Sequence, residues 1–165
     1  MKCLTVAVAV AIAIAIAILL SVPVTADEDK DRHAGYYYPE PVTEETYVAR
    51  AQTAADSTRD TRLGFVTALT KIAFARPYPP TYAIFAKGSD AEKLIIVSMG
   101  DAGFRTLYQA RGLMAQMTAI ARTTDLFRKL AVEDFFTFYD LLKLLGFRQL
   151  TISDGETFSH QIVIR

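Results

Sequence analysis

His160 is the side chain of this sequence that is best suited to acid–base chemistry. An imidazole acts as a general base when a hydroxyl lies within hydrogen-bond reach of one of its nitrogens. The nearest hydroxyl in the sequence belongs to Ser159, but neighbouring side chains of a strand point to opposite faces of a sheet. We therefore interpret His160 as a packed or hydrogen-bonded histidine near the rim of a sheet, with a general base as the alternative.

The motifs that usually position a nucleophile, a metal or a phosphate are absent from the sequence. There is no Gly-x-Ser-x-Gly turn and no His-Glu-x-x-His pair. Gly88-Ser89-Asp90 is not followed by a helix start, as a phosphate-binding loop would be. Gly100-Asp101-Ala102-Gly103 lacks the alternating acids of a calcium loop. We expect no cofactor and no metal, and the sequence favours a protein that is not an enzyme.

Two groups of residues are the candidates for binding a ligand or a partner. Arg122-Thr123-Thr124-Asp125 borders an expected helix end, and Arg122 and Asp125 together with His160 form the candidate anion or polar site. Tyr78 and the run Tyr36, Tyr37, Tyr38 lie beside prolines and form the candidate partner-binding residues. A tyrosine ring buries area while its hydroxyl stays hydrated, so the run could pack on the edge of its own domain or bind a partner. The sequence leaves both open.

Hydrophobic periodicity and turn residues predict the elements that must position these side chains. Ser57 or Thr58 is expected to cap the first helix, and Pro77 to end it. Gly112 inside a helix indicates close packing, and Gly146 fits the left-handed position after one. Glu133, Thr137, Asp140 and Lys143 form the thin polar strip of the last helix, with Glu133-Asp134 at its start. The expected strands are 46–51, 82–87, 94–99 and a hairpin within 149–164, and the expected helices are about 56–76, 104–122, 126–130 and 133–145.

The final hairpin has a register that the side-chain alternation can predict. A two-residue Asp154-Gly155 turn would pair apolar residues with polar ones. A three-residue loop, Ser153-Asp154-Gly155 with Gly155 left-handed, pairs Leu150 with Phe158 on one face, and we choose it. The elements together predict an α+β fold, an antiparallel sheet of four to five strands with three to four helices packed on it. We expect neither βαβ alternation nor a repeat.

The first 26 residues read as a cleavable signal peptide. Lys2 precedes an uncharged run, and Val24-Thr25-Ala26 supplies the small residues that a signal peptidase accepts. We expect residues 27–45 to be an acidic leader rich in Tyr and Pro, and 46–165 to be a single globular domain. An uncleaved anchor is the alternative. The expected location is periplasmic or secreted, and loss of Cys3, the single cysteine, would leave a domain without disulfides.

The charge of the chain restricts the classes of partner that it can bind. Basic and acidic residues balance at 18 each over the whole sequence, and residues 46–165 carry about four more bases than acids. These bases are scattered, without the dense basic run typical of nucleic-acid binding. We expect a protein or a small molecule as the partner, no nucleic acid, and no membrane after signal cleavage.

Six runs of residues resemble a family of small exported proteins of Gram-negative bacteria without an assigned activity. Some members carry the label of the molybdopterin-guanine dinucleotide biosynthesis protein A type, which implies a nucleotidyltransferase that uses GTP and magnesium. The Gly-rich loop with following Arg and Lys that holds the nucleotide in those enzymes has no counterpart here, so no functional residue carries over. The resemblance implies export and a single domain. Its runs are residues 34–41, 63–70, 82–88, 91–97, 134–138 and 151–155.

The combined observations predict an exported periplasmic protein that is a non-enzymatic binding or interaction module. The alternative is a small hydrolase or nucleotide-handling enzyme with its site around His160, Arg122 and Asp125. A second alternative is a membrane-tethered accessory factor, if the signal is not cleaved.

Overall fold

A five-stranded sheet with helices on one face makes up the part of the chain that the structure describes. This computed structural model describes residues 39–75, 77–99 and 103–165, and all of them belong to one compact unit of the chain. The predicted signal peptide and the tyrosine run at 36–38 lie outside these residues. The elements are β1 (Thr43–Tyr47), α3 (Arg59–Phe74), β2 (Tyr82–Lys87), β3 (Lys93–Ser98), α4 (Leu107–Arg122), α5 (Asp125–Leu130), α6 (Phe138–Leu144), β4 (Gln149–Ser153) and β5 (Ser159–Ile164).

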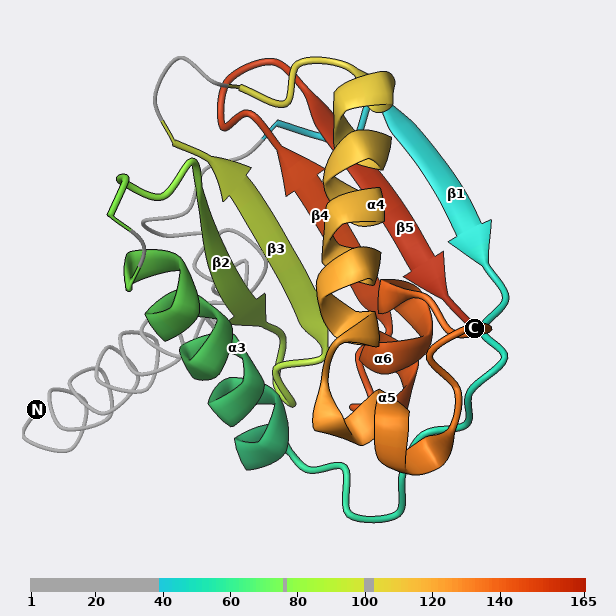
Figure 1. Ribbon diagram of the computed structural model, residues 1–165. Helices are drawn as coiled ribbons and strands as arrows, with labels where there is room; N and C mark the ends of the chain where they lie inside the picture. The colour runs from blue at the N-terminus through green and yellow to red at the C-terminus, as the bar shows by residue number, and fades with distance from the viewer. Residues whose placement is uncertain (1–38, 76, 100–102) are drawn as a thin grey trace, which may run out of the picture. The chain divides into compact units, whose positions relative to one another are not determined.

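The sheet is mixed, with the strand order β1-β5-β4-β3-β2 (Figure 1). Two antiparallel pairs, β2 with β3 and β4 with β5, confirm the two predicted hairpins. The pairs β3 with β4 and β1 with β5 are parallel. The α+β class is therefore confirmed, whereas the prediction of an antiparallel sheet is wrong. The first strand also begins at Thr43, before its expected start at Thr46.

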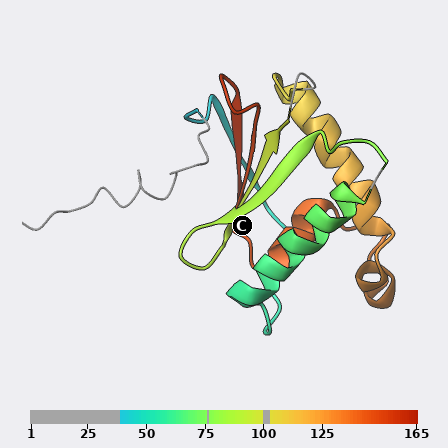
Figure 2. The same cartoon turned by 90° about the vertical axis from the view of Figure 1, so that its left-hand side faces the viewer.

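The long connection between β3 and β4 explains the parallel pairing. It carries α4, α5 and α6, and a crossover of this length returns the chain in its original direction beside the strand it left. We expected no βαβ alternation, and the structure contains one βαβ unit at this connection. Figures 1 and 2 show α3, α4 and α6 on the same side of the sheet.

The hydrophobic core lies between the sheet and these helices. Alternate residues of the three central strands point into it, as the period of two along a strand requires. The apolar stripe expected on the helix near 104–122 is present on α4, where Ala110, Met114 and Met117 are buried. The strand residues of the core are Ile84, Leu94, Ile96, Leu150, Ile152, Ile162 and Ile164.

Helix starts follow local capping. Thr58 caps α3 as predicted, since its side chain accepts the N–H of Thr61 at 3.2 Å. The helix expected over 133–145 begins only at Phe138, because the N–H of Thr137 donates to the carboxylate of Asp140 at 2.8 Å and fixes the first turn there. Glu133 therefore precedes the helix instead of starting it. Asp140, expected on the polar strip, is fully buried.

The loop between β4 and β5 differs from the predicted one in length. Leu150 pairs with Ile162, so the loop spans residues 154–158 and the predicted pairing of Leu150 with Phe158 is wrong. The Asp154 carboxylate accepts three backbone N–H groups of this loop at 2.8–2.9 Å, which stabilises the longer turn. Gly155 is left-handed, as predicted, with φ of 80°.

Replacing Asp154 with alanine is expected to lower the free energy of unfolding by about 1 kcal/mol, the typical effect of losing a side-chain cap. Partial burial raises the pKa of Asp154, but the N–H groups of Glu156, Phe158 and Thr157 lower it more, so the net pKa lies below 3.8. The carboxylate thus stabilises the fold above about pH 4 and loses this effect as pH falls through the lowered pKa. Urea unfolding at pH 7 and at pH 3 measures it, with Glu156→Ala as the control. A difference from wild type that does not shrink toward pH 3 would contradict this role.

Candidate functional site

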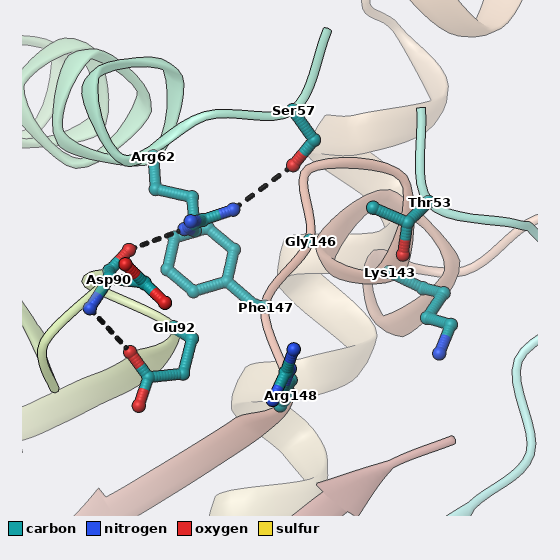
Figure 3. Close-up of a pocket in the computed structure, with 9 residues that line it drawn as sticks. All are labelled: Thr53, Ser57, Arg62, Asp90, Glu92, Lys143, Gly146, Phe147 and Arg148. Carbon is teal, nitrogen blue, oxygen red and sulfur yellow. Dashed lines mark hydrogen bonds between the residues drawn. The ribbon is translucent and has the colours of Figure 1, made fainter. Parts of the chain in front are cut away.

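A polar cavity of about 320 Å³ opens at the end of the sheet where β3 and β4 begin (Figure 3). Three regions of the chain contribute to it: α3 with the stretch before it, the β2–β3 loop, and α6 with the residues between α6 and β4. We call it the Arg62 cavity. Its lining residues are Thr53, Ser57, Arg62, Asp90, Glu92, Lys143, Gly146, Phe147 and Arg148.

Arg62 forms one end of this cavity and joins the three regions. It is 7% exposed. Nε donates to the carbonyl of Asp90 at 2.8 Å, and Nη1 donates to Ser57 Oγ at 3.0 Å and to the carbonyl of Leu145 at 3.2 Å. Nη2 has no hydrogen-bond partner among residues 39–75, 77–99 and 103–165. The guanidinium therefore fixes the walls of the cavity and keeps donors that a ligand can use.

Two glycines allow the chain to approach the charged groups of the cavity. Gly146 has φ of 79°, and a Cβ there would overlap Ser57 Oγ and the guanidinium of Arg62. Its left-handed conformation after α6 was predicted, and the structure confirms it. Gly88 has φ of 94° and lies against the carboxylate of Glu92, which also accepts the N–H of Asp90 at 3.0 Å.

The charged side chains of the cavity carry both signs. Figure 3 shows Asp90 and Glu92 on one side, which we call the acidic wall, and Lys143 on the other, with Arg148 between Glu92 and Lys143; we call Lys143 and Arg148 the basic wall. The ion pairs within the described part of the chain are Arg111–Glu45, Arg128–Asp125 and His160–Glu45. None of them joins the two walls. The protein therefore leaves both sets of charges available.

A second, shallower cavity of about 330 Å³ lies between β1 and α4. Glu45 accepts from Arg111 at 3.2 Å and contacts His160 Nε2 at 3.2 Å. Burial raises the pKa of Glu45, but the hydrogen bonds and charges of His160 and Arg111 outweigh it and leave the pKa below 4.5. The charges here are paired within the protein, unlike those of the Arg62 cavity.

Two tyrosines in tilted ring contact form the aromatic side of this second cavity. The rings of Tyr47 and Tyr139 lie 4.6 Å apart between centroids. Burial, reinforced by the negative charge of Glu45, raises the pKa of Tyr139 to about 12. The hydroxyl of Tyr139 therefore keeps its proton at physiological pH.

The structure separates the residues of the predicted polar site. His160 is 2% exposed, and its Nδ1 lies 2.7 Å from Thr43 Oγ1, which agrees with a packed, hydrogen-bonded histidine. Arg122 donates to the carbonyl of Phe136 at 3.3 Å, and Asp125 pairs with Arg128 at 2.9 Å. In the described residues, no hydrogen bond or ion pair joins Arg122 or Asp125 to His160.

Tyr78 is the one predicted partner-binding residue that the structure describes, because Tyr36, Tyr37 and Tyr38 lie outside the described residues. It is 80% exposed in the connection between α3 and β2. It borders a cavity of about 160 Å³ beside Pro79 and Pro80. Among the described residues of this connection, none carries a charge that would define a ligand.

The Arg62 cavity does not follow from the motifs of the sequence. By sequence alone Gly88-Ser89-Asp90 is a turn, and Lys143 is part of a polar strip. One signal is present: Arg62 lies three residues before Phe65 and seven before Leu69, on the apolar face of its helix. A cation on that face must find partners inside the protein.

The fold and the cavity define a small α+β protein with a charged cavity lined by residues from three regions of the chain. Among the residues that the structure describes, no group of three or more His, Cys, Asp or Glu side chains could hold a metal ion. Within the same residues, no helix is long and apolar enough to span a membrane. Comparison of the chain with protein-family models, curated proteins and solved structures found no match.

Proposed function

We propose that this protein is an exported, non-enzymatic binding module whose Arg62 cavity holds a small charged molecule. The observation that supports this proposal is the set of five charged side chains around one cavity, with no ion pair between its walls in the described part of the chain. The signal-peptide pattern of residues 1–26 supports export to the periplasm or beyond.

The size and chemistry of the cavity support a small ligand. A volume of about 320 Å³ lies at the lower end of the range for small-molecule sites, roughly 300–1,000 Å³. Lys143, Arg148 and Nη2 of Arg62 offer donors to an anionic group, and charge-assisted hydrogen bonds are about twice as strong as neutral ones.

The groups of the cavity support binding rather than catalysis. No histidine is among its described lining residues. Ser57, a lining hydroxyl, donates to the carbonyl of Leu145 at 2.6 Å and accepts from Arg62. A serine becomes a strong nucleophile when a base takes its proton, and here its partners are a carbonyl and a cation.

One observation favours a hydrolase as the second candidate. Thr43 Oγ1, the imidazole of His160 and the carboxylate of Glu45 form a hydroxyl–imidazole–carboxylate series with distances of 2.7 and 3.2 Å. The carboxylate of Glu45 accepts a hydrogen bond from the proton-bearing Nε2 of His160, so Nδ1 of the neutral imidazole carries no proton. Nδ1 would then accept the hydroxyl proton of Thr43. The same Glu45 also holds Arg111, so this carboxylate is shared between two partners.

The test uses the purified protein, low ionic strength and three probes: inorganic phosphate, acetate and glycylglycine. We expect at least one probe to bind and to shift the backbone amide NMR signals of Gly88 and Gly146. The variant Lys143→Gln/Arg148→Gln should weaken that binding by about tenfold or more, since it removes two charged donors. Lys71→Gln/Lys129→Gln removes the same charge away from the cavity and should leave affinity unchanged.

Two outcomes would overturn the binding proposal. The first is that no probe shifts Gly88 or Gly146 up to millimolar concentrations. The second is that both double variants weaken binding equally, which indicates a general charge effect. Hydrolysis of p-nitrophenyl acetate that Thr43→Val abolishes would instead support the hydrolase.

A further inference from the structure

We propose that the ligand of the Arg62 cavity is a zwitterion, namely a free amino acid or a short peptide. Its carboxylate lies on the basic wall, Lys143 and Arg148, and its ammonium group lies on the acidic wall, Asp90 and Glu92. This inference rests on the proposed function and specifies the class of ligand.

The arrangement of charge in the cavity favours a molecule that carries both signs. Lys143 lies across the cavity from Asp90 and Glu92, Arg148 lies between them, and no ion pair of the described residues joins the two walls. A purely anionic ligand would be attracted by the basic wall but repelled by the acidic wall. A purely cationic ligand would be attracted by the acidic wall but repelled by the basic wall. Two unit charges 4 Å apart interact strongly at the effective dielectric constant near a protein surface. A zwitterion is attracted by both walls.

The backbone fixes the spacing of the two walls. The carbonyl of Glu92 accepts the N–H of Arg148 at 2.8 Å, just before the paired strands β3 and β4 begin. This hydrogen bond joins the walls at their base, while Arg62 joins the carbonyls of Asp90 and Leu145 at the far end. The walls therefore keep their spacing without a ligand, and a preformed site loses less free energy on binding.

The size and lining of the cavity select among ligand classes. Nucleotides and other polyphosphates carry several negative charges, which Asp90 and Glu92 would oppose, and they are large for a cavity of about 320 Å³. The neutral side chains of Thr53 and Ser57 complete a polar lining. Such a lining suits the backbone of an amino acid or a short peptide between its two charged ends.

The experiment compares glycylglycine with two blocked forms on the purified protein in solution. N-acetylglycylglycine lacks the ammonium group, and glycylglycine amide lacks the carboxylate. We expect glycylglycine to bind at least about five times more tightly than either blocked form, measured by the shifts of the Gly88 and Gly146 amide signals.

Two variants separate the two walls. Asp90→Asn removes a charge from a side chain that makes no hydrogen bond among the described residues, so the fold should be kept. This variant is expected to weaken the binding of glycylglycine at least about fivefold and to leave the binding of N-acetylglycylglycine unchanged. Lys143→Gln should weaken the binding of both molecules. Asp134 is an exposed acid outside the cavity, and Asp134→Asn should leave the binding of both unchanged.

The outcomes distinguish this inference from the proposed function. If phosphate or N-acetylglycylglycine binds as tightly as glycylglycine, the site is a simple anion site: the proposed function stands and the zwitterion inference falls. If no probe binds, both fall. If Asp90→Asn weakens every probe equally, the acidic wall does not recognise an ammonium group and the inference is wrong.

Discussion

Replacing Gly146 with valine is expected to lower the free energy of unfolding by about 3 kcal/mol or more. The left-handed conformation costs a residue with a side chain about 1–2 kcal/mol. The new Cβ would also overlap Ser57 Oγ and the guanidinium of Arg62, and the partly buried hydrogen bonds that these groups make to backbone carbonyls contribute about 1–3 kcal/mol each. For a domain of this size we expect the melting temperature to fall by roughly 10 °C.

Gly64 and Gly112 provide matched controls for this prediction. Both lie inside helices, and apart from the surrounding backbone of the helix itself no described atom comes within 4 Å of the Cβ position at either. The close packing predicted for Gly112 is therefore wrong, and alanine at either position should raise stability by up to about 1 kcal/mol through helix propensity. A Gly146→Val protein as stable as wild type would show that the close approach of Gly146 to Arg62 does not contribute to the stability of the fold.

Replacing Asp140 with alanine is expected to have an effect of similar size, about 4 kcal/mol, because several partly buried donors lose their acceptor at once. Asp140 is 0% exposed. Its carboxylate accepts the N–H of Arg50 at 2.7 Å, the N–H of Thr137 at 2.8 Å and the hydroxyl of Tyr47 at 3.1 Å. The side chain thus joins β1 and the residues after it to the start of α6.

Urea unfolding of Asp140→Ala beside Asp134→Ala measures this effect. Asp134 is an exposed acid six residues earlier, and its replacement should change stability by less than about 0.5 kcal/mol. Asp140→Asn keeps one acceptor oxygen and should fall between the two. Equal stability of the Asp140 and Asp134 alanine variants would contradict the role of the buried carboxylate.

Local features of the sequence predicted the elements well, because local chemistry determines them. Thr58 caps α3, and Gly146 and Gly155 adopt the left-handed conformations expected of them. The hairpin of β2 and β3 follows from two apolar runs separated by turn residues. In each case the residues that decide the structure lie within a few positions of one another.

Two features depend on residues far apart in the sequence. One is the pairing of the two hairpins with each other, and the other is the Arg62 cavity. Periodicity cannot show that helices cross the sheet before β4, and so it could not predict the parallel pairing of β3 with β4. Arg62 reaches carbonyls at positions 90 and 145, and no spacing rule connects these. Asp140 fitted a solvated helix face by its spacing, yet its carboxylate holds the backbone of Arg50 in the segment after β1.

The parallel pairing of β1 with β5 has a consequence for how the chain matures. Thr43 and His160, which are hydrogen-bonded partners across this pair, are 117 residues apart in the sequence. Contacts of such high sequence separation slow folding, because the entropy of closing the loop is lost before the contacts form.

The sheet therefore stays incomplete until β5 has been synthesised. A nascent chain can form the β2–β3 hairpin and α4 early, but β1 waits for its partner. If the chain crosses a membrane unfolded, as the proposed export requires, this order of synthesis holds back the native sheet during transit. The sheet would then close in the compartment where the protein acts.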